Sequence, residues 1–589
     1  MHRLILSAAL AAGGVFAATA TAADPESGTV SQASPTISFT SGPNAISNPG
    51  YPDTGVCQNP ALPCDDFALT VEVPAPLPEG VGAAIRVITT ADATEDYDIY
   101  LLNADGEQVN SSTQGGTPPE EMFHVVDPGT TTFTVRVNPW LVTGTTAETT
   151  ITLEFFESSG GGGDGGTGND GRLPFDPTAP RYSIYVSPPN EGNDAGEPTI
   201  GFNPFTERAM FISYTNALRV TFPENLDEPL PQACDAQWEN KSGLVTTLNS
   251  LDPIMYTDKA TGRTFNSQLA GANSLFEYSD DDGDTWIPGQ IGLPNGGADH
   301  QGVVSGPYPE GFPTDGLLFP NAVYYCSQSV AAAFCARSDD GGQTFGPGTP
   351  FKNLDCGAGA LHGHPKVAPD GTLYVPDSSQ CVAGLGLDGS SEKVVAFVSE
   401  DAGTTYDVRV LPESEGGAGS DPSIALASDG TAYMCYENAD GTARVAVSRD
   451  KGVTWEHDQD VGAAAGLVAT RFPAAIAGDP DRAACAFLGT TTVGPNEDLA
   501  FEGVWYPYIA TTYDGGESWQ LVNLSPDDPV QGFGGVGPSG TNRNLLDFND
   551  LEIDNLGRTL FAYADGCIGG CVADPSPVSY THLTLPTKA

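Results

Sequence analysis

Between residues 35 and 157, apolar and polar residues alternate in short stretches, as in residues 67–73, 84–88 and 133–137. Turn-forming residues, such as those at 103–106, separate these stretches. Side chains on a β-strand point alternately to opposite faces of a sheet, so the alternation predicts half-buried strands. Several such strands in succession predict an antiparallel β-sandwich over residues 35–157.

Residues 158–180 interrupt this pattern, because residues 158–171 are all Gly, Ser, Asp, Asn or Thr. Such a composition cannot bury a core and predicts a flexible linker. From residue 181 onward, apolar strands return, and several begin behind a short turn that carries an acidic residue or a histidine. Seven strand starts occur, at residues 197–200, 252–255, 300–303, 364–367, 421–424, 472–475 and 550–553, and all but residues 472–475 carry an acidic residue or a histidine.

A second repeat has the order hydroxyl, any residue, Asp, any, Gly, any, hydroxyl, aromatic. Five such octads occur, at residues 279–286, 338–345, 399–406, 448–455 and 512–519. In a tight hairpin the Asp accepts hydrogen bonds from turn N–H groups and the Gly adopts a positive φ. We therefore assign structural roles to the octad carboxylates Asp281, Asp340, Asp401, Asp450 and Asp514.

The octad is the Asp box, and five copies resemble the sialidase-like (BNR-repeat) β-propeller superfamily. The resemblance implies an all-β fold with an Asp-box β-propeller over residues 181–577. Seven strand starts favour seven blades, although the catalytic sialidases of that superfamily have six. The predicted sandwich resembles, through residues 96–101, the pre-peptidase C-terminal-type modules appended to secreted bacterial hydrolases.

The last predicted blade lacks at least one strand, so we expect it to be truncated. Residues 182–186 could close the ring from the N-terminal side. Residues 578–589 fit no blade pattern, and we interpret them as a non-native tail.

The N-terminus carries a basic start, an apolar run and a small-residue segment that ends at Ala22. This predicts a signal peptide over residues 1–22, cleaved near Ala22, and a secreted or periplasmic protein without a transmembrane segment. The formal net charge of −53 makes nucleic acid an unfavourable partner. The chain has 11 Cys, which in an exported protein predict disulfides. The closest pairs are Cys57/Cys64, Cys326/Cys335, Cys567/Cys571 and Cys356/Cys381.

In a propeller the innermost strand of each blade begins near the central axis, so the strand starts are expected to converge on one face. Glycoside hydrolysis needs two carboxyl groups that flank the scissile bond. The alternative is that an acidic residue before each strand only caps a turn. Our catalytic candidates are Glu197, Asp252, Asp421 and His364, and our substrate-binding candidates are His300, Asp299, His362, Arg471 and Asp550, with Phe472 at the sixth start.

No metal ligand or cofactor is assigned, although two features leave calcium or another divalent cation open. Residues 362–364 place two imidazoles close together, and Asp96 and Asp98 lie on one predicted strand. For the strand acids, the alternative is that they are solvated at a strand edge.

The superfamily resemblance implies an exo-sialidase-type glycoside hydrolase acting on extracellular glycans. Catalytic sialidases use three Arg to hold the substrate carboxylate, one of them in an Arg-Ile-Pro segment at the first blade. The nearest segment, residues 471–473, lies at the sixth strand start, and the first start carries Glu197 instead. The alternative function is a non-catalytic propeller, expected to be a monomer, that binds glycan or protein at the cell surface.

Overall fold

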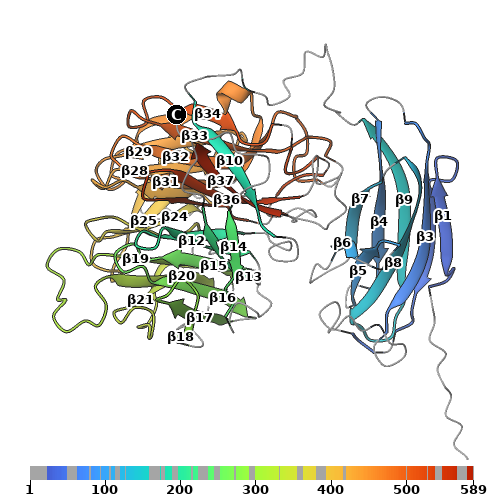
Figure 1. The fold of residues 1–589 in the computed structure, drawn as a ribbon, viewed down its shortest axis with the longest axis horizontal. Helices are drawn as coiled ribbons and strands as arrows, with labels where there is room; N and C mark the ends of the chain where they lie inside the picture. The colour runs from blue at the N-terminus through green and yellow to red at the C-terminus, as the bar shows by residue number, and fades with distance from the viewer. Residues whose placement is uncertain are drawn as a thin grey trace, which may run out of the picture. The chain divides into compact units, whose positions relative to one another are not determined.

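The fold was analysed in a computed structural model. It describes residues 23–44, 46–48, 57, 63–77, 81–92, 95–104, 106, 108–112, 120–126, 128–157, 173, 179–188, 197–213, 216–222, 236–243, 252–270, 273–290, 299–329, 332–353, 362–379, 393–415, 420–498, 501–526, 528–532, 534–537, 545, 547–566 and 580–587. The regular structure in these ranges is β-strand, apart from the short 3-10 helix η2 (Ala463–Ala465) (Figure 1). The prediction of an all-β protein is confirmed. The chain divides into two compact units, residues 1–162 and 163–589.

The first unit contains two sheets that share one core. One sheet has the order β1(Ser27–Ser31), β3(Asp65–Val73), β8(Gly129–Leu141), β5(Asp96–Leu102), β6(Gln108–Ser112), and the other has the order β2(Thr36–Ser41), β9(Ala147–Glu157), β4(Val81–Thr90), β7(Glu120–Val125). Strand β3 alternates buried and exposed residues along its length, as its sequence predicts. Phe67 on β3 stacks on Phe39 of β2, with ring centroids 4.3 Å apart. The apolar faces of the two sheets therefore pack against each other.

Within the described part of the second unit there are seven four-stranded antiparallel sheets, six of which use four consecutive strands. The first three are β11(Thr199–Asn203), β12(Arg208–Ser213), β13(Asn216–Thr221), β14(Gln237–Asn240); β15(Ile254–Thr257), β16(Thr264–Ala270), β17(Asn273–Ser279), β18(Ile287–Pro288); and β19(Asp299–Gly306), β20(Ala322–Ser329), β21(Ala332–Ser338), β22(Thr349–Asn353). The next three are β23(Lys366–Val367), β24(Leu373–Ser379), β25(Lys393–Ser399), β26(Asp407–Val410); β27(Ser423–Leu426), β28(Ala432–Glu437), β29(Ala443–Ser448), β30(Glu456–Asp460); and β31(Ala469–Ala477), β32(Ala483–Thr490), β33(Tyr506–Thr512), β34(Gln520–Asn523).

The seventh sheet takes strands from both ends of the second unit. Its order is β10(Arg181–Val186), β37(Tyr580–Thr587), β36(Thr559–Asp565), β35(Asp550–Ile553). The N-terminal stretch thus joins the last sheet, as its sequence suggested. Our interpretation that residues 578–589 fit no blade pattern is wrong for Tyr580–Thr587, which pair with both β10 and β36. This strand supplies hydrogen-bond partners for two backbone edges that would otherwise lack them.

The first strands of the seven sheets form a closed series. Strand β11 contacts β15, and the contacts continue through β19, β23, β27 and β31 to β35, which contacts β11 again. Neighbouring sheets also share hydrophobic clusters. One cluster joins Ile200 and Phe211 of the first sheet to Leu560 of the seventh. The first strands therefore surround a common centre, and the fourth strands lie at the periphery.

Each octad forms the turn between the third and fourth strands of its sheet. In the first, Thr285 donates its backbone N–H and its hydroxyl to the two carboxylate oxygens of Asp281, each at 2.7 Å, and the Gly283 N–H donates to the Ser279 hydroxyl at 2.8 Å. The same three bonds recur at 2.6–3.0 Å in the other four octads. All five carboxylates are thus hydrogen-bonded within their own peripheral turns.

Three disulfides lie among the described residues. Cys57–Cys64 and Cys326–Cys335 confirm two predicted pairs. Cys435–Cys485 was not predicted, because 50 residues separate its members in the sequence. They meet because they occupy β28 and β32, the second strands of neighbouring sheets. The predicted pairs Cys567/Cys571 and Cys356/Cys381 lie outside the described residues, as does the predicted signal peptide.

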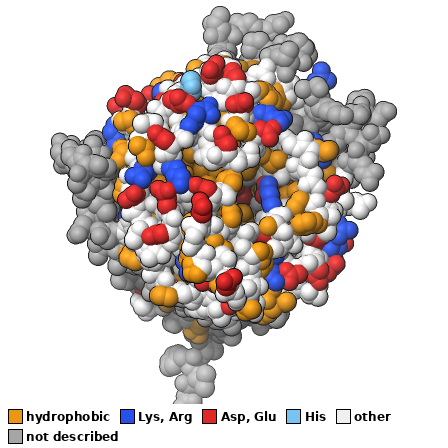
Figure 2. Space-filling model, turned by 90° about the vertical axis from the view of Figure 1, so that its left-hand side faces the viewer, with side chains coloured by type: hydrophobic (Ala, Val, Ile, Leu, Met, Phe, Trp, Pro, Cys, Tyr) orange, Lys and Arg blue, Asp and Glu red, His pale blue; other side chains and the backbone are white. Residues whose placement is uncertain are grey.

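The surface carries charge of both signs, with many acidic side chains among apolar ones (Figure 2). In the part of the chain that the structure describes, no helix is long and apolar enough to cross a membrane.

Candidate functional site

The inner strands follow one another in a closed series, and several of their starts lie close together. Glu197 from the first sheet lies within electrostatic reach of Asp252 from the second, His300 from the third and Asp547 from the seventh. Asp421 from the fifth sheet interacts with His300 and His362. We call the following residues the central cluster: Glu197, Asp252, His300, His362, His364, Asp421, Asp547 and Phe548.

The best-defined contact in the central cluster joins His300 to Asp421. The Nδ1 atom of His300 lies 3.0 Å from Oδ2 of Asp421 and 3.3 Å from the carbonyl oxygen of His362. Both neighbours accept hydrogen bonds, so Nδ1 carries the proton. Burial raises the pKa of Asp421, but His300, His362 and Lys352 outweigh burial and leave this pKa below its usual value. Asp421 is therefore ionised at neutral pH.

Glu197 has the opposite electrostatic environment. Its residue is only 3% exposed. Burial raises the pKa of Glu197 well above its usual value, and the nearby carboxyls of Asp252 and Asp547 raise it further. The backbone N–H of Asp547 donates to Oε1 of Glu197 at 3.3 Å, which opposes the rise without cancelling it. The two carboxyls that interact with His300 therefore differ: Glu197 favours the protonated acid, and Asp421 favours the carboxylate.

His362 and His364 are neutral imidazoles. Burial lowers the pKa of His362 to about 4 and that of His364 to about 3, where Lys366 adds to the effect. Nδ1 of His362 lies 2.9 Å from the carbonyl oxygen of Gly363 and must donate to it, so Nε2 bears the lone pair. The Nε2 atoms of both rings are buried without a hydrogen-bond partner among the described residues. A ligand that donates hydrogen bonds could satisfy them.

Phe548 provides an aromatic surface beside these imidazoles. It stacks on His364 with ring centroids 4.4 Å apart, and it meets His300 edge-on at 5.2 Å. Flat apolar surfaces of this kind pack against aromatic or sugar rings. The sequence analysis missed Asp547 and Phe548, although both lie within three residues of Asp550 at the seventh strand start.

Three strand starts carry backbone strain. Glu197, His300 and Phe472 have φ values of 55°, 49° and 55°, in the left-handed region that non-glycine residues seldom adopt. The ladders of β19 and β31 are also irregular at His300 and Phe472. Such bulges redirect side chains, and strain of this kind costs about 1–3 kcal/mol per residue. The surrounding packing therefore holds these residues in orientations that a regular strand would not allow.

Asp550 is bound to a neighbouring backbone group rather than to the central cluster. Asp550 accepts a hydrogen bond from the backbone N–H of Ile200 at 3.1 Å, and this bond links the seventh and first sheets. Burial raises the pKa of Asp550 to about 6, while Lys366 opposes that rise. Asp299 opens β19, but its side chain lies outside the described residues.

Arg471 belongs to a separate ion-pair network. Its guanidinium donates to Glu437, to Asn496 at 2.7 Å and to Glu497 at 2.9 Å. The side chain of Arg471 is 4% exposed. Burial raises the pKa of Glu437 to about 8, an effect that the Arg471 charge opposes. The structure therefore gives Arg471 internal partners, in place of the substrate carboxylate expected from the sequence.

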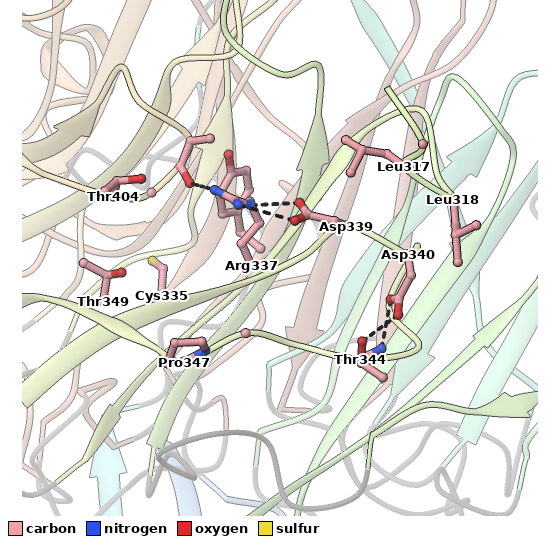
Figure 3. A pocket seen from close by; sticks show the side chains of 15 residues that line it. Leu317, Leu318, Cys335, Arg337, Asp339, Asp340, Thr344, Pro347, Thr349 and Thr404 are labelled. Carbon is pink, nitrogen blue, oxygen red and sulfur yellow. Dashed lines mark hydrogen bonds and ion pairs between the residues drawn. The ribbon is translucent and has the colours of Figure 1, made fainter. Parts of the chain in front are cut away.

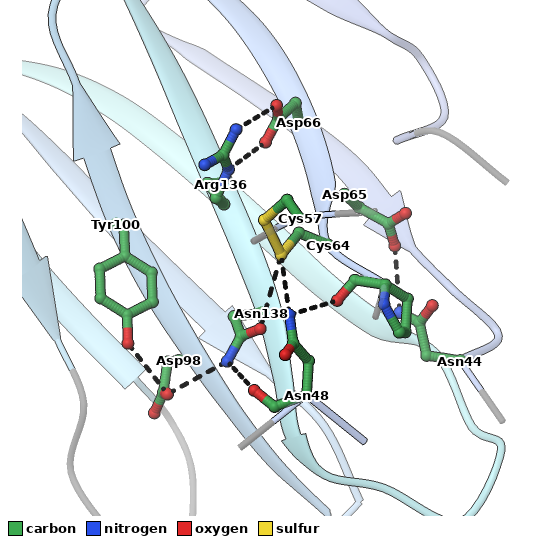
Figure 4. Close-up of a disulfide and its surroundings, with 11 residues drawn as sticks. Asn44, Asn48, Cys57, Cys64, Asp65, Asp66, Asp98, Tyr100, Arg136 and Asn138 are labelled. Atoms are coloured by element: carbon green, nitrogen blue, oxygen red, sulfur yellow. Dashed lines mark hydrogen bonds and ion pairs between the residues drawn. A yellow bond between two sulfur atoms is a disulfide. The ribbon is translucent and has the colours of Figure 1, made fainter. Parts of the chain in front are cut away.

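Metal binding was tested on the same residues. Among the described residues, no three His, Cys, Asp or Glu side chains form a group that could hold a metal ion. The expectation based on Asp96 and Asp98 of the first unit also changes, because Asp98 is only 4% exposed. Oδ2 of Asp98 accepts hydrogen bonds from the Tyr100 hydroxyl at 3.2 Å and from Asn138 at 3.4 Å (Figure 4). Asp98 is a buried, hydrogen-bonded carboxyl rather than a solvated acid at a strand edge.

A cavity of about 470 Å³ lies between the octad turns of the third and fourth sheets, away from the strand starts (Figure 3). Leu317 and Leu318 contribute apolar lining. Arg337 donates to Asp339 at 2.8 Å and to the carbonyl oxygen of Ala402 at 2.6 Å. Arg337 pairs with Asp339, and Asp340 is held by its own octad turn. These groups already have partners, so the central cluster is the better candidate for acid–base chemistry.

The chain matches no protein-family model and no curated protein sequence. Among solved structures, it is similar to Hadza microbial sialidase Hz136 at 12% identity and a TM-score of 0.36, over 87% of this chain and 94% of that chain. It is also similar to a protein of unknown function from Dyadobacter fermentans DSM 18053, at 12% identity and a TM-score of 0.34, over 69% of this chain and 98% of that chain. At TM-scores this low, neither likeness supports an argument about the activity of this chain.

Proposed function

We propose that the second unit is a seven-bladed β-propeller and that the first unit is an accessory β-sandwich. Seven four-stranded sheets, a closed series of inner strands and clusters shared between neighbouring sheets support the propeller. Two sheets that enclose one core support the sandwich. The disulfides are consistent with a protein that works outside the cell or in the periplasm.

On this scaffold we propose an exported glycoside hydrolase whose active site is the central cluster. One observation carries this proposal: His300 contacts Asp421 at 3.0 Å and also acts on Glu197, and the surroundings raise the pKa of Glu197 and lower that of Asp421. A glycosidase needs one protonated and one ionised carboxyl group. Two carboxyls whose surroundings shift their pKa values in opposite directions meet this requirement.

In the proposed reaction, Glu197 donates its proton to the glycosidic oxygen as the bond to the anomeric carbon breaks. Asp421 stabilises the positive charge that develops on the sugar, either by direct attack or by taking a proton from the attacking water. Its contact with Nδ1 of His300 fixes the orientation of the carboxylate. The Nε2 atom of His362 accepts a hydrogen bond from the sugar, Nε2 of His364 donates or accepts another, and Phe548 packs against the sugar ring.

The proposal is tested with the full chain and a panel of glycans and aryl glycosides. Glu197→Gln and Asp421→Asn should each remove turnover while the melting temperature stays within a few degrees of the wild type. Loss of the Glu197 proton predicts a fall in kcat/KM at high pH, and protonation of Asp421 predicts a fall at low pH. Full activity in both variants would overturn the assignment.

A non-catalytic glycan-binding propeller is the second candidate function. The observation that favours it is the hydrogen bond from the Ile200 N–H to Asp550. This bond gives one strand-start carboxylate a structural role, as expected if the strand-start carboxylates are not catalytic. The two functions differ in one experiment. Binding on a glycan array without release of sugar from any bound glycan would favour the binding protein.

A further inference from the structure

We infer that the central cluster binds a sugar without a carboxylate, and that an amino sugar with a free ammonium group binds better than its neutral or acidic counterpart. The inference rests on the proposed glycan site and specifies the class of sugar that this site takes. A sialidase would instead require a sugar that carries a carboxylate.

Two basic side chains near the site, Lys352 and Arg471, already have acidic partners. Nζ of Lys352 lies 2.8 Å from Oδ2 of Asp377, and the two side chains are 5% and 1% exposed. Arg471 is paired with both Glu437 and Glu497. A ligand carboxylate would have to compete with these buried carboxylates for each cation, so neither group is a ready receptor for an acidic sugar.

The remaining charge of the cluster is negative. Asp252 and Asp547 lie near Glu197, and Asp421 lies 3.0 Å from Nδ1 of His300. Lys366 is a nearby cation that acts on Asp550 and His364. The carboxyls of Asp252 and Asp547 already disfavour a second negative charge on Glu197. The negative potential of these carboxyls also disfavours a ligand carboxylate and favours an ammonium group.

The hydrogen-bonding state of His362 is an independent reason to expect that the site disfavours a ligand carboxylate. Nε2 of His362 carries a lone pair, because Nδ1 of that ring donates to the Gly363 carbonyl oxygen. A carboxylate has only acceptors and would face this lone pair unfavourably, whereas ammonium and hydroxyl groups donate to it. Phe548, stacked on His364, adds a ring whose face attracts cations.

The inference is tested by calorimetric titration of the full-length protein with glucosamine, glucose and glucuronic acid, and with the matching galactose series. We expect the amino sugar of at least one series to bind ten-fold or more tightly than the acidic sugar, with the neutral sugar between them. Raising the salt concentration should shrink this ratio, because charge sets it. Equal affinities, tighter binding of the acidic sugar, or no binding by any of the six sugars would each overturn the inference.

Turnover of 4-methylumbelliferyl glycosides of an amino sugar, a neutral sugar and N-acetylneuraminic acid separates this inference from the proposed function. Cleavage of only the sialoside would overturn the inference and leave the glycoside hydrolase standing. If the amino sugar binds most tightly and the acidic sugar least tightly, but no glycan is cleaved, the proposal of a glycoside hydrolase is overturned and this inference stands.

A matched pair of variants tests the role of the Arg471 network. Glu437→Gln removes one buried partner of Arg471, and it should narrow the ratio of amino to acidic sugar affinity by several-fold. Glu239→Gln removes the partner of Arg219, whose Nε lies 2.8 Å from a Glu239 carboxylate oxygen on the outer strand of the first sheet. This control should leave the ratio unchanged. An equal effect of both variants would show that net charge alone, and not the Arg471 pairing, sets the preference.

Discussion

Carboxylates sit in two kinds of turn in the second unit, and their hydrogen-bond environments differ. In the peripheral octads each Asp bonds to its own turn; hydrogen bonds from Thr454, for example, hold the pKa of Asp450 below its usual range. At the inner strand starts, burial and carboxyls from other sheets raise the pKa of Glu197, whereas His300, His362 and Lys352 lower that of Asp421 against the effect of burial. The octad carboxylates are therefore bonded within their own turns, whereas the environments of Glu197 and Asp421 depend on contacts between sheets.

The largest predicted effect is a loss of activity when a strand-start carboxylate, but not an octad carboxylate, is replaced. Asp421→Asn should lower kcat by about 10²–10⁴-fold, the usual contribution of a general acid or base. The melting temperature should change little, because the amide keeps the shape of the side chain. Kinetics with an aryl glycoside cleaved by the wild type, together with calorimetry, would check this. A large loss of stability with normal kcat would place Asp421 with the octads.

The next effect extends the comparison to the first unit. Burial, followed by the charge of Asp96, raises the pKa of Asp98 to about 7. The folded chain then binds more protons than the unfolded chain between about pH 4 and 7, so the free energy of unfolding falls as pH rises through this window. A shift of this size corresponds to about 4 kcal/mol at most.

Asp98→Asn should remove this pH dependence and raise the melting temperature at pH 8 relative to the wild type. Melting curves of both full-length proteins at pH 4, 6 and 8 would measure the difference. Asp66→Asn is the control, since Asp66 pairs on the surface with Arg136. Parallel pH profiles for the wild type and Asp98→Asn would contradict the prediction.

A smaller effect tests the octads themselves. Asp281→Ala removes the acceptors for Ser279 and Thr285, and it should cost about 1–3 kcal/mol of unfolding free energy. The affinity for sugar should not change. Chemical denaturation and calorimetric titration of the same protein would show whether stability and binding separate in this way.

The smallest effect is expected at a surface ion pair beside an octad. Lys451 contacts Asp370 at 2.9 Å and Glu400 at 2.6 Å, and all three side chains are at least 35% exposed. Water and salt screen such pairs, so Lys451→Met should change stability by less than about 1 kcal/mol. A larger loss in chemical denaturation would mean that bonds between octads matter as much as bonds within them.

The sequence predicted the repeating parts of the structure well. Octads and strand starts are local patterns, and they located the peripheral turns and the inner strands of consecutive sheets. Strand-start residues such as Glu197, His300 and Asp421 were grouped before the structure brought them together. Their chemical roles remain predictions.

Features that depend on contacts between sheets were missed. The partners of Arg471 come from residues 25–34 positions away, and no local pattern marks them. Cys435 and Cys485 pair only because neighbouring sheets align their second strands. The strand Tyr580–Thr587 was overlooked because it pairs with β10, almost 400 residues earlier in the chain.

The Cys435–Cys485 disulfide has a consequence for motion within the ring. Because neighbouring sheets share their cores, local opening of one sheet exposes apolar surface on the next. A covalent link between β28 and β32 makes the fifth and sixth sheets open together or not at all. We expect the backbone amides of the fifth and sixth sheets to exchange with solvent in a single slow step. Local opening of the ring should then begin in the sheets that lie away from Asp421.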